Sequence, residues 1–486
     1  MSHPEEMDDD LLDVEDAAEE IENSGDDIPM DSDAEDEEEE VVLQNDSIAY
    51  FDLPQDSLFT IAQHPLHPSL VAVGGSAGPE DDAPGAGWLF DTSAAASRPV
   101  LPASYASNPA ETPKSTQLDS LFALEGHDDS INTLAWTLPR GDFLVSGGLD
   151  GRMKVWKADV RPGTVDMKLV GEAQEVEEVN WISACPSPNH ENTIALGASD
   201  GSVWVYTIDA SDASNPLQIV QSYFLHTAPC TAGAWTPDGH LLATVSEDSS
   251  LYVWDVWGEA AARNMTSENG MTVVSLTGED QRFEVEGGLY SIAIDPRGSF
   301  VAAGGAGGAV KIVSLPRLSP ASSQQRGKSP ADATAGGQIL ASLHTQGDSV
   351  ESLAVSLTAT TPPTTLLAAG SVDGSICVYD ATRRFAVRRH IAGAHEDHSV
   401  VRLEFVKNTW LLTSCGMDGV VRRWDLRSGG ATGTTAAGAA DRGLVKEWKG
   451  HRGDGEGGGV LGFVQGETGE RIVTAGDDGV ALVFEA

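Results

Sequence analysis

Gly147-Gly148-Leu149-Asp150-Gly151 leads through a short alternating run to Trp156, and this pattern decides the fold. Asp-Gly supplies the positive backbone dihedrals of a tight turn, so the stretch predicts two short strands joined by a hairpin. Eight copies about 45 to 67 residues apart predict a repeat architecture. The other copies are Ala198-Ser199-Asp200-Gly201 to Tyr206, Ser246-Glu247-Asp248 to Trp254, Gly305 to Gly308 before Val313, Val372-Asp373-Gly374 to Tyr379, Met417-Asp418-Gly419 to Trp424, Asp477-Asp478-Gly479 to Phe484, and a degraded first copy from Pro84-Gly85 to Phe90.

Each unit contains four short segments with the alternation of half-buried strands. In the second unit we expect strands at Ile131–Trp136, Phe143–Ser146, Met153–Trp156 and Met167–Val170. A four-stranded sheet of this size cannot bury both of its faces alone, whereas sheets stacked around an axis bury them against each other. The sequence therefore predicts an all-β, eight-bladed β-propeller over residues 41–486.

The two ends of the repeat array predict how the ring closes. Val480–Phe484 occupies the place of a third strand, so the last unit lacks its fourth. Ser47–Phe51 precedes the first unit in the way that Ser120–Leu124 precedes the second. We therefore expect Ser47–Phe51 to complete the eighth blade and to cover its edge strand.

Long irregular segments occur at the same position in several of the units. Residues 92–117, 258–271, 314–337 and 427–443 all lie between a third and a fourth strand, so they emerge on one face of the ring, called here the loop face. The opposite, open face carries the fourth-to-first connections and the second-to-third turns. Apart from Ser76–Pro84 and Arg452–Gly459 it is free of long insertions, and it is a candidate docking platform.

The chain is strongly acidic, with a formal net charge of −46 over 486 residues. Residues 1–40 hold 21 Asp and Glu and no Lys or Arg, and such a segment cannot collapse onto a core, so we expect a disordered acidic tail. Its role is open between solubilisation and recruitment of a basic partner. The remaining residues are acidic too. A field of this sign repels nucleic acid and anionic membranes and attracts basic peptides.

The cysteines and the apolar runs indicate the compartment. Cys185, Cys230, Cys377 and Cys415 lie far apart without a CxxC pair, which favours buried reduced thiols in a reducing compartment. The N-terminus lacks the pattern of a secretory signal, and no apolar run reaches the roughly 18 residues of a membrane span. We expect a cytoplasmic protein.

Gly126-His127, Ser146, Asp150 and Trp156 resemble the Gly-His and Trp-Asp signature of WD40 repeats. Trp254-Asp255 and Trp424-Asp425 repeat its ending, and Gly450-His451 repeats its beginning. The segments Leu43–Phe51 and Phe59–Pro65, with the acidic tail, are similar to a WD40 family of ribosome-assembly chaperones whose animal counterpart is the angio-associated migratory cell protein. That resemblance implies an eight-bladed propeller dedicated to one client, a basic large-subunit ribosomal protein of the L-ten (universal L-sixteen) class. It implies capture of the client's basic N-terminal segment, during synthesis on the ribosome, and delivery to the maturing subunit.

His127, Ser146 and Asp150 have the composition of a hydrolase triad, but with Trp156 they have the spacing of a structural WD40 tetrad that ties a fourth-to-first connection to two strands. We interpret them as structural, because a triad depends on geometry and roles, and we expect only this unit to keep all four members.

The histidine pairs His64/His67 and His395/His398 lack further ligands nearby and are interpreted as turn residues. The Gly304–Gly308 run lacks the Lys of a phosphate loop and is interpreted as a decayed turn. We therefore expect no enzyme, metal or cofactor.

Carboxylates recur at the entry to the innermost strands and in the turns of the open face. Clustered like charges repel each other, and a bound basic peptide relieves that repulsion through charge-assisted pairs. Phe59, Tyr290 and Trp181 lie near the same rim, where aromatic anchors are typical of binding hot spots. The predicted partner-binding residues are Asp128, Asp129, Glu177, Glu178, Glu247, Glu286, Tyr290, Asp348, Glu351, Glu396, Asp397 and Asp477.

These features predict a monomeric binding protein that holds a basic segment across its acidic face. We expect it to bind neither nucleic acid directly nor membranes. The alternative is a generic WD40 scaffold or adaptor that bridges other proteins, because fold alone does not decide function.

Overall fold

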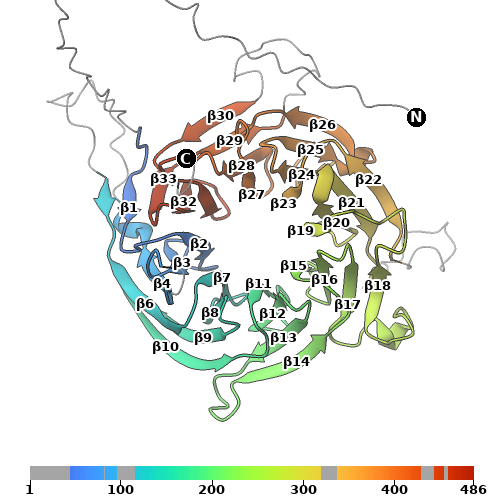
Figure 1. The fold of residues 1–486 in the computed structure, drawn as a ribbon, viewed down its shortest axis with the longest axis horizontal. Helices are drawn as coiled ribbons and strands as arrows, with labels where there is room; N and C mark the ends of the chain where they lie inside the picture. The colour runs from blue at the N-terminus through green and yellow to red at the C-terminus, as the bar shows by residue number, and fades with distance from the viewer. Residues whose placement is uncertain are drawn as a thin grey trace, which may run out of the picture. The chain divides into compact units, whose positions relative to one another are not determined.

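The computed structural model describes residues 44–80, 83–95, 115–161, 163–318, 336–427, 443–453 and 458–486. The predicted acidic tail at residues 1–40 lies outside the described residues. Leu43–Ala486 form one compact unit. Its strands make eight separate sheets arranged around a central axis, so the predicted eight-bladed propeller is confirmed (Figure 1).

Seven blades are four-stranded antiparallel sheets, and blade 8 has a fifth strand that pairs in parallel; the first strand of every blade lines the axis. The strands of the first four blades are β2 (Leu58–Gln63), β3 (Leu70–Ser76), β4 (Gly85–Asp91) and β6 (Ser120–His127) in blade 1; β7 (Ile131–Trp136), β8 (Phe143–Gly148), β9 (Met153–Arg161) and β10 (Thr164–Ala173) in blade 2; β11 (Val179–Ala184), β12 (Thr193–Ala198), β13 (Val203–Ile208) and β14 (Leu217–Tyr223) in blade 3; and β15 (Cys230–Trp235), β16 (Leu241–Ser246), β17 (Leu251–Asp255) and β18 (Thr272–Leu276) in blade 4.

The second half of the ring repeats this order. Its strands are β19 (Leu289–Ile294), β20 (Phe300–Gly305), β21 (Ala309–Ser314) and β22 (Ile339–His344) in blade 5; β23 (Val350–Leu357), β24 (Thr365–Ser371), β25 (Ile376–Asp380) and β26 (Ala386–Ile391) in blade 6; β27 (Val400–Phe405), β28 (Leu411–Gly416), β29 (Val421–Asp425) and β30 (Leu444–Trp448) in blade 7; and β31 (Val460–Val464), β32 (Arg471–Gly476), β33 (Ala481–Glu485), β1 (Ala49–Phe51) and β5 (Thr116–Gln117) in blade 8.

Blade 8 is built from both ends of the array, as predicted. β1 pairs antiparallel with β33, with Ala49 opposite Val483 and Phe51 opposite Ala481, and Figure 1 shows the two strands side by side. Phe51 is fully buried and stacks on Phe90 of blade 1 at a centroid distance of 4.7 Å. Truncating a buried Phe costs about 3–5 kcal/mol, so this ring is a major anchor of the closure. The parallel addition of β5 was not predicted.

The second strands form the middle of the core. β8, β12, β16, β20 and β24 are buried along their whole length, because both faces of each blade pack against neighbouring blades. The core is divided into clusters that bridge successive blades. The outer strands are half-exposed and longer than the sequence indicated in blade 2, where β9 and β10 form a hairpin reaching Arg161 and Thr164.

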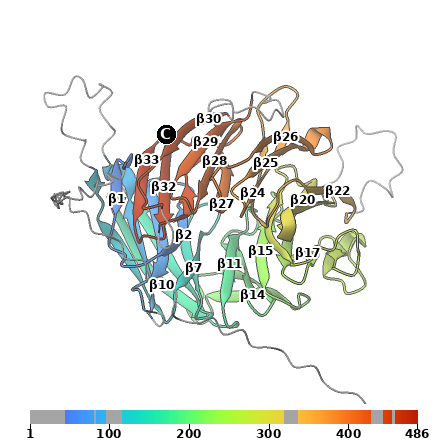
Figure 2. The ribbon, with the colours of Figure 1, turned by 45° about the horizontal axis from the view of Figure 1, so that its top comes forward.

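The two faces of the ring differ as expected from the connections. The strands run between the faces in the turned view of Figure 2. The short 3-10 helices η1 (Thr92–Ala94), η3 (Ala261–Arg263) and η5 (Ala381–Arg383) lie in third-to-fourth connections on the loop face, and η4 (Ala306–Gly308) forms the second-to-third turn of blade 5. Within the described ranges, no helix is long and apolar enough to cross a membrane.

Candidate functional site: an acidic recess at the channel mouth

A β-bulge follows the first residue of all eight first strands. In each, the register with the second strand shifts by one, which leaves a single extra residue without a partner. Such bulges bend a strand and re-aim a side chain. They occur at the open-face end of the strands, so one residue per blade surrounds the mouth of the central channel. This bulge ring consists of Phe59, Asn132, Asn180, Thr231, Tyr290, Glu351, Val401 and Leu461.

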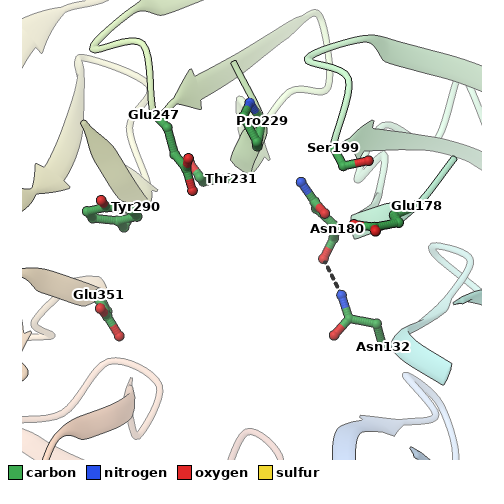
Figure 3. A pocket seen from close by; sticks show the side chains of 9 residues that line it. All are labelled: Asn132, Glu178, Asn180, Ser199, Pro229, Thr231, Glu247, Tyr290 and Glu351. Atoms are coloured by element: carbon green, nitrogen blue, oxygen red, sulfur yellow. Dashed lines mark hydrogen bonds between the residues drawn. The ribbon is translucent and has the colours of Figure 1, made fainter. Parts of the chain in front are cut away.

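Five consecutive members of the bulge ring line a recess of about 540 Å³ (Figure 3). They come from blades 2 to 6 and are joined by residues of the neighbouring connections and turns. The complete lining is Asn132, Glu178, Asn180, Ser199, Pro229, Thr231, Glu247, Tyr290 and Glu351. The recess therefore combines three carboxylates, two amides, two hydroxyls and one phenol ring, with Pro229 as its apolar member.

Hydrogen bonds to the next blade hold the polar members of the ring. Asn132 Nδ2 donates to the carbonyl of Val179 at 3.2 Å, and Asn180 Nδ2 donates to the carbonyl of Cys230 at 3.0 Å. Thr231 Oγ1 donates to the carbonyl of Leu289 at 2.7 Å. Each bond spans two blades, so the wall of the recess is rigid.

Tyr290 lies between Glu247 and Glu351 in Figure 3. Its hydroxyl donates to the carbonyl of Gly287 at 2.5 Å, and Gly287 and Gly288 adopt φ of 97° and 94°, a conformation that favours glycine. Partial burial raises the pKa of Tyr290, and the charges of Glu247 and Glu351 raise it further. The ring is thus fixed beside two carboxylates, where a cation can contact its face and both charges.

Glu351 is the most perturbed carboxylate of the recess. Loss of surrounding water raises the pKa of Glu351, and the negative charge of Asp348 raises it further. Its side chain still opens to solvent, so a ligand can reach it. A bound cation stabilises the charged form of crowded carboxylates of this kind most, because the cation replaces lost hydration and offsets their repulsion.

The recess brings together four of the twelve predicted binding residues: Glu178, Glu247, Tyr290 and Glu351. The others belong to the turns and connections of the open face and do not line the recess. Several already have partners within the chain: Asp128 pairs with Arg152 at 2.7 Å, and Asp477 accepts from the Ser57 hydroxyl at 2.5 Å. The remaining members of this group are Asp129, Glu177, Glu286, Asp348, Glu396 and Asp397.

The predicted binding residues did not include the other five members of the lining: Asn132, Asn180, Ser199, Pro229 and Thr231. Thr231 occupies the same bulge position as Tyr290 and Glu351, so alignment of the strand entries could have found it. Of the aromatic candidates, Trp181 packs between blades and donates to the carbonyl of Cys230 at 3.2 Å. Phe59 belongs to the bulge ring and is 39% exposed, but it lies outside the recess.

The residues His127, Ser146 and Asp150 are buried or half-buried and hydrogen-bonded to each other. Nε2 of His127 lies 2.7 Å from the Ser146 hydroxyl, and Nδ1 lies 3.1 Å from Asp150. Trp156 is buried beside them, with its ring centroid 6.4 Å from that of His127. Ser146 is fully buried, so it cannot meet a substrate.

The expectation that a single unit keeps the tetrad was wrong. In blade 7, His395 contacts Asp418 at 2.8 Å and Ser414 at 2.7 Å, and Trp424 donates to Ser414 at 2.9 Å. Burial would raise the pKa of Asp418, but His395 and Arg422 lower it to about 2. His395 was interpreted as a turn residue because no further metal ligands lie near it, and the Gly-His signature does not mark it, since Gly393 precedes it by two residues.

Two further blades use threonine in place of serine. His226 contacts Thr244 at 2.8 Å, and Trp254 donates to the same hydroxyl at 2.8 Å, while Ser250 relays the contact to Asp248. In blade 8, His451 contacts Thr474 at 2.8 Å and Asp478 at 3.0 Å. The tetrad geometry therefore tolerates either hydroxyl, and these histidines support the fold.

No group of three or more His, Cys, Asp or Glu within the described ranges could hold a metal ion. His64 is buried, its Nδ1 accepts from the backbone N–H of Leu66 and of His67, and burial lowers its pKa to about 4. It is a turn residue. The four cysteines are buried free thiols.

The chain is similar to known proteins in sequence and in structure. The WD domain, G-beta repeat model matches residues 118–157, 217–255 and 337–380. The crystal structure of Sqt1 from Chaetomium thermophilum is 57% identical, with a TM-score of 0.78, over 91% of this chain and 98% of that one. The chain belongs to the Sqt1 family of WD40 proteins.

Other Sqt1-type relatives extend this comparison. A second Chaetomium thermophilum Sqt1 structure, bound to the N-terminus of the ribosomal protein L10, is 58% identical with a TM-score of 0.77 over 91% of this chain and all of that one. The ribosome assembly protein SQT1 of Saccharomyces cerevisiae is 27% identical over 96% of this chain and 92% of its own length. Human angio-associated migratory cell protein is 23% identical over 75% of this chain and 69% of its own length.

Proposed function

We propose that this protein is a dedicated chaperone of large-subunit assembly that binds the basic N-terminal segment of an L10-class ribosomal protein on its open face. It shields that segment, from the nascent chain onwards, and helps to deliver it to the pre-ribosome. We expect it to act in the cytoplasm and to catalyse no reaction. The buried free thiols are in keeping with a reducing compartment.

One observation carries the proposal. The acidic recess places Glu247 and Glu351 beside a fixed tyrosine, and Glu178 across from it, at the mouth of the channel, in a chain 58% identical to a relative that was crystallised with the N-terminus of L10 (Figure 3). Carboxylates accept from arginine in bidentate geometry, and the tyrosine face attracts the same guanidinium. An extended basic segment fits this recess by charge and by hydrogen bonding.

The mechanism is electrostatic capture. The negative open face raises the local concentration of a basic segment and speeds its association. Once bound, the segment's charges are neutralised and cannot attract RNA. Release requires an acceptor that competes for the same basic side chains.

The test measures binding of a fluorescent peptide of the client's N-terminal segment by anisotropy. We expect the Glu247→Lys, Glu351→Lys double variant to lose about 100-fold in affinity at about 50 mM salt, since two attractive contacts become repulsive. Wild-type affinity should also fall steeply towards about 500 mM salt.

The matched control is Asp166→Lys with Glu268→Lys, which changes the net charge equally at exposed sites away from the open face. The control should bind within about threefold of wild type, because distant exposed charges are screened. Equal losses in both double variants, or wild-type binding that ignores salt, would contradict binding at the recess.

A further inference from the structure

Positive charge is concentrated in one part of this acidic chain. Residues 381–450 hold 12 of the 29 Lys and Arg but only 7 of the 75 Asp and Glu, a net charge of +5 in a chain of −46. This stretch covers the end of blade 6 and nearly all of blade 7. Arg389, Arg422 and Arg423 of this stretch are buried, and its remaining basic residues favour a surface with an electrostatic preference opposite to that of the recess.

Four arginines of this stretch form what we call the arginine rim: Arg383, Arg384, Arg388 and Arg427. They belong to the third-to-fourth connections of blades 6 and 7 and to the start of β26, so they lie at the loop face. The side chains of Arg383 and Arg427 are 78% and 70% exposed. Arg384 is exposed as well, and it makes no ion pair within the described ranges.

A strained connection presents the first two arginines. Arg384 and Phe385 have φ of 55° and 58°, in the left-handed region that non-glycine residues rarely adopt. Phe385 is buried against Phe300 with centroids 5.2 Å apart, and its N–H donates to the carbonyl of Asp380 at 3.0 Å. Two consecutive residues in this region cost free energy, and such strain concentrates at functional sites.

Contacts between the blades hold the other two arginines. The Arg388 guanidinium lies 4.3 Å from the Trp410 ring centroid of blade 7 and donates to the carbonyls of Leu426 at 3.0 Å and Arg427 at 3.1 Å. Arg427 is thereby kept beside β26. These contacts fix the Arg388 guanidinium and the backbone of Arg427, which lowers the entropic cost of binding an anion there.

Among the residues that the structure describes, the two carboxylates that pair with the rim are too few to neutralise its four arginines. Arg427 bonds to Asp425, and Arg383 lies 3.6 Å from Asp380. Burial lowers the pKa of the neighbouring Arg389, and the positive charge of Arg388 lowers it further. The contacts of Arg427 with Asp425 and of Arg383 with Asp380 show that arginines of the rim bind carboxylates at this surface.

We propose that the arginine rim binds a short acidic segment of a protein partner. The rim goes beyond the proposed function and does not depend on it. Arginine forks match carboxylates bidentately. RNA offers similar acceptors, but it carries charge along its whole length, so its flanks would meet the acidic remainder of the surface, whereas a short acidic segment ends where the rim ends.

The experiment uses the full chain and a short fluorescein-labelled peptide of alternating Glu and Ser, measured by anisotropy at about 100 mM salt, where charges beyond about 10 Å are screened. We expect saturable binding that falls about tenfold or more in the Arg383→Glu, Arg384→Glu variant, because two contacts become repulsive. The matched control is Arg140→Glu with Arg161→Glu, which reverses two exposed, paired arginines of blade 2. The control should bind within about twofold of wild type.

The result separates this proposal from the recess function, because the rim variant should bind the client's basic peptide like wild type. Absence of acidic-peptide binding by the wild type would overturn the proposal. So would equal losses in the rim and control variants, because the effect would then belong to net charge. Tighter binding of a single-stranded RNA than of the acidic peptide would overturn the choice of a protein partner. Unchanged thermal unfolding excludes misfolding of the rim variant.

Discussion

The bulge ring divides into two arcs, in which the same β-bulge presents side chains of different chemistry. The polar arc of blades 2 to 6 presents Asn132, Asn180, Thr231, Tyr290 and Glu351. The apolar arc of blades 7, 8 and 1 presents Val401, Leu461 and Phe59. All eight residues are extra residues of equivalent bulges. The repeat therefore supplies the positions, whereas the residue at each position supplies the chemistry.

Among single substitutions in the two arcs, the largest effect should come from Tyr290, which precedes Glu351 in the polar arc. We expect Tyr290→Ala to weaken binding of the basic client peptide by about 2 kcal/mol, or roughly 30-fold, because it removes a rigid aromatic anchor. Tyr290→Phe keeps the ring and loses only the hydrogen bond to Gly287, so it should cost about threefold. Calorimetric titration measures both. Equal losses would assign the effect to the hydroxyl.

Acidification should weaken the polar arc and leave the apolar arc unaffected. The carboxylate form of Glu351 attracts the peptide, and its pKa is raised, so this attraction is lost as pH falls, starting at higher pH than for an ordinary glutamate. We expect the dissociation constant to rise about fivefold more between about pH 7 and pH 5 in wild type than in Glu351→Gln. Parallel pH profiles for the two proteins would refute this role for Glu351.

Converting part of the apolar arc tests whether position or chemistry sets the difference between the arcs. Val401→Glu places a carboxylate at the bulge of blade 7, next to Glu351 in the order of the ring. We expect basic-peptide affinity to rise about threefold at about 50 mM salt, with Val401→Gln as the neutral control. An unchanged affinity in Val401→Glu would mean that the peptide does not reach the apolar arc.

The smallest effect should come from Phe59, which is 39% exposed. We expect Phe59→Ala to weaken binding by about 0.5 kcal/mol, about twofold, independently of salt, since the contact is apolar. A loss larger than that of Tyr290→Ala would reverse the ranking of the two arcs. The measurement is the same titration at about 50 and about 500 mM salt.

The architecture was predictable because its signals are local and repeated. The Asp-Gly turns and the alternating strands predicted eight blades, and the match between Ser47–Phe51 and Ser120–Leu124 predicted the closing strand β1. β5 was not predicted, because a strand of two residues is too short to show an alternating pattern. Three further tetrads or partial tetrads were missed, because Thr244 and Thr474 replace serine and because His395 follows its glycine by two residues.

The site was predictable in part. Tyr290 and Glu351 were found by aligning strand entries, and their convergence with Glu247 follows from the closed ring. The bulge was not predictable, because it is a register shift between two strands and leaves no residue signature in one of them. The ion pair of Asp128 with Arg152 and the hydrogen bond from Ser57 to Asp477 depend on side-chain directions that spacing does not give.

The pairing of β1 with β33 sets an order of events in synthesis. The strand containing Ala49 is made hundreds of residues before its partner Val483. The ring therefore cannot close until β33 has left the ribosome, and seven blades must wait with an open seam. Long-range closure of this kind is slow relative to local hairpin formation. A circular permutant that joins the ends of β33 and β1 by a short linker would make this blade a local unit and should fold faster.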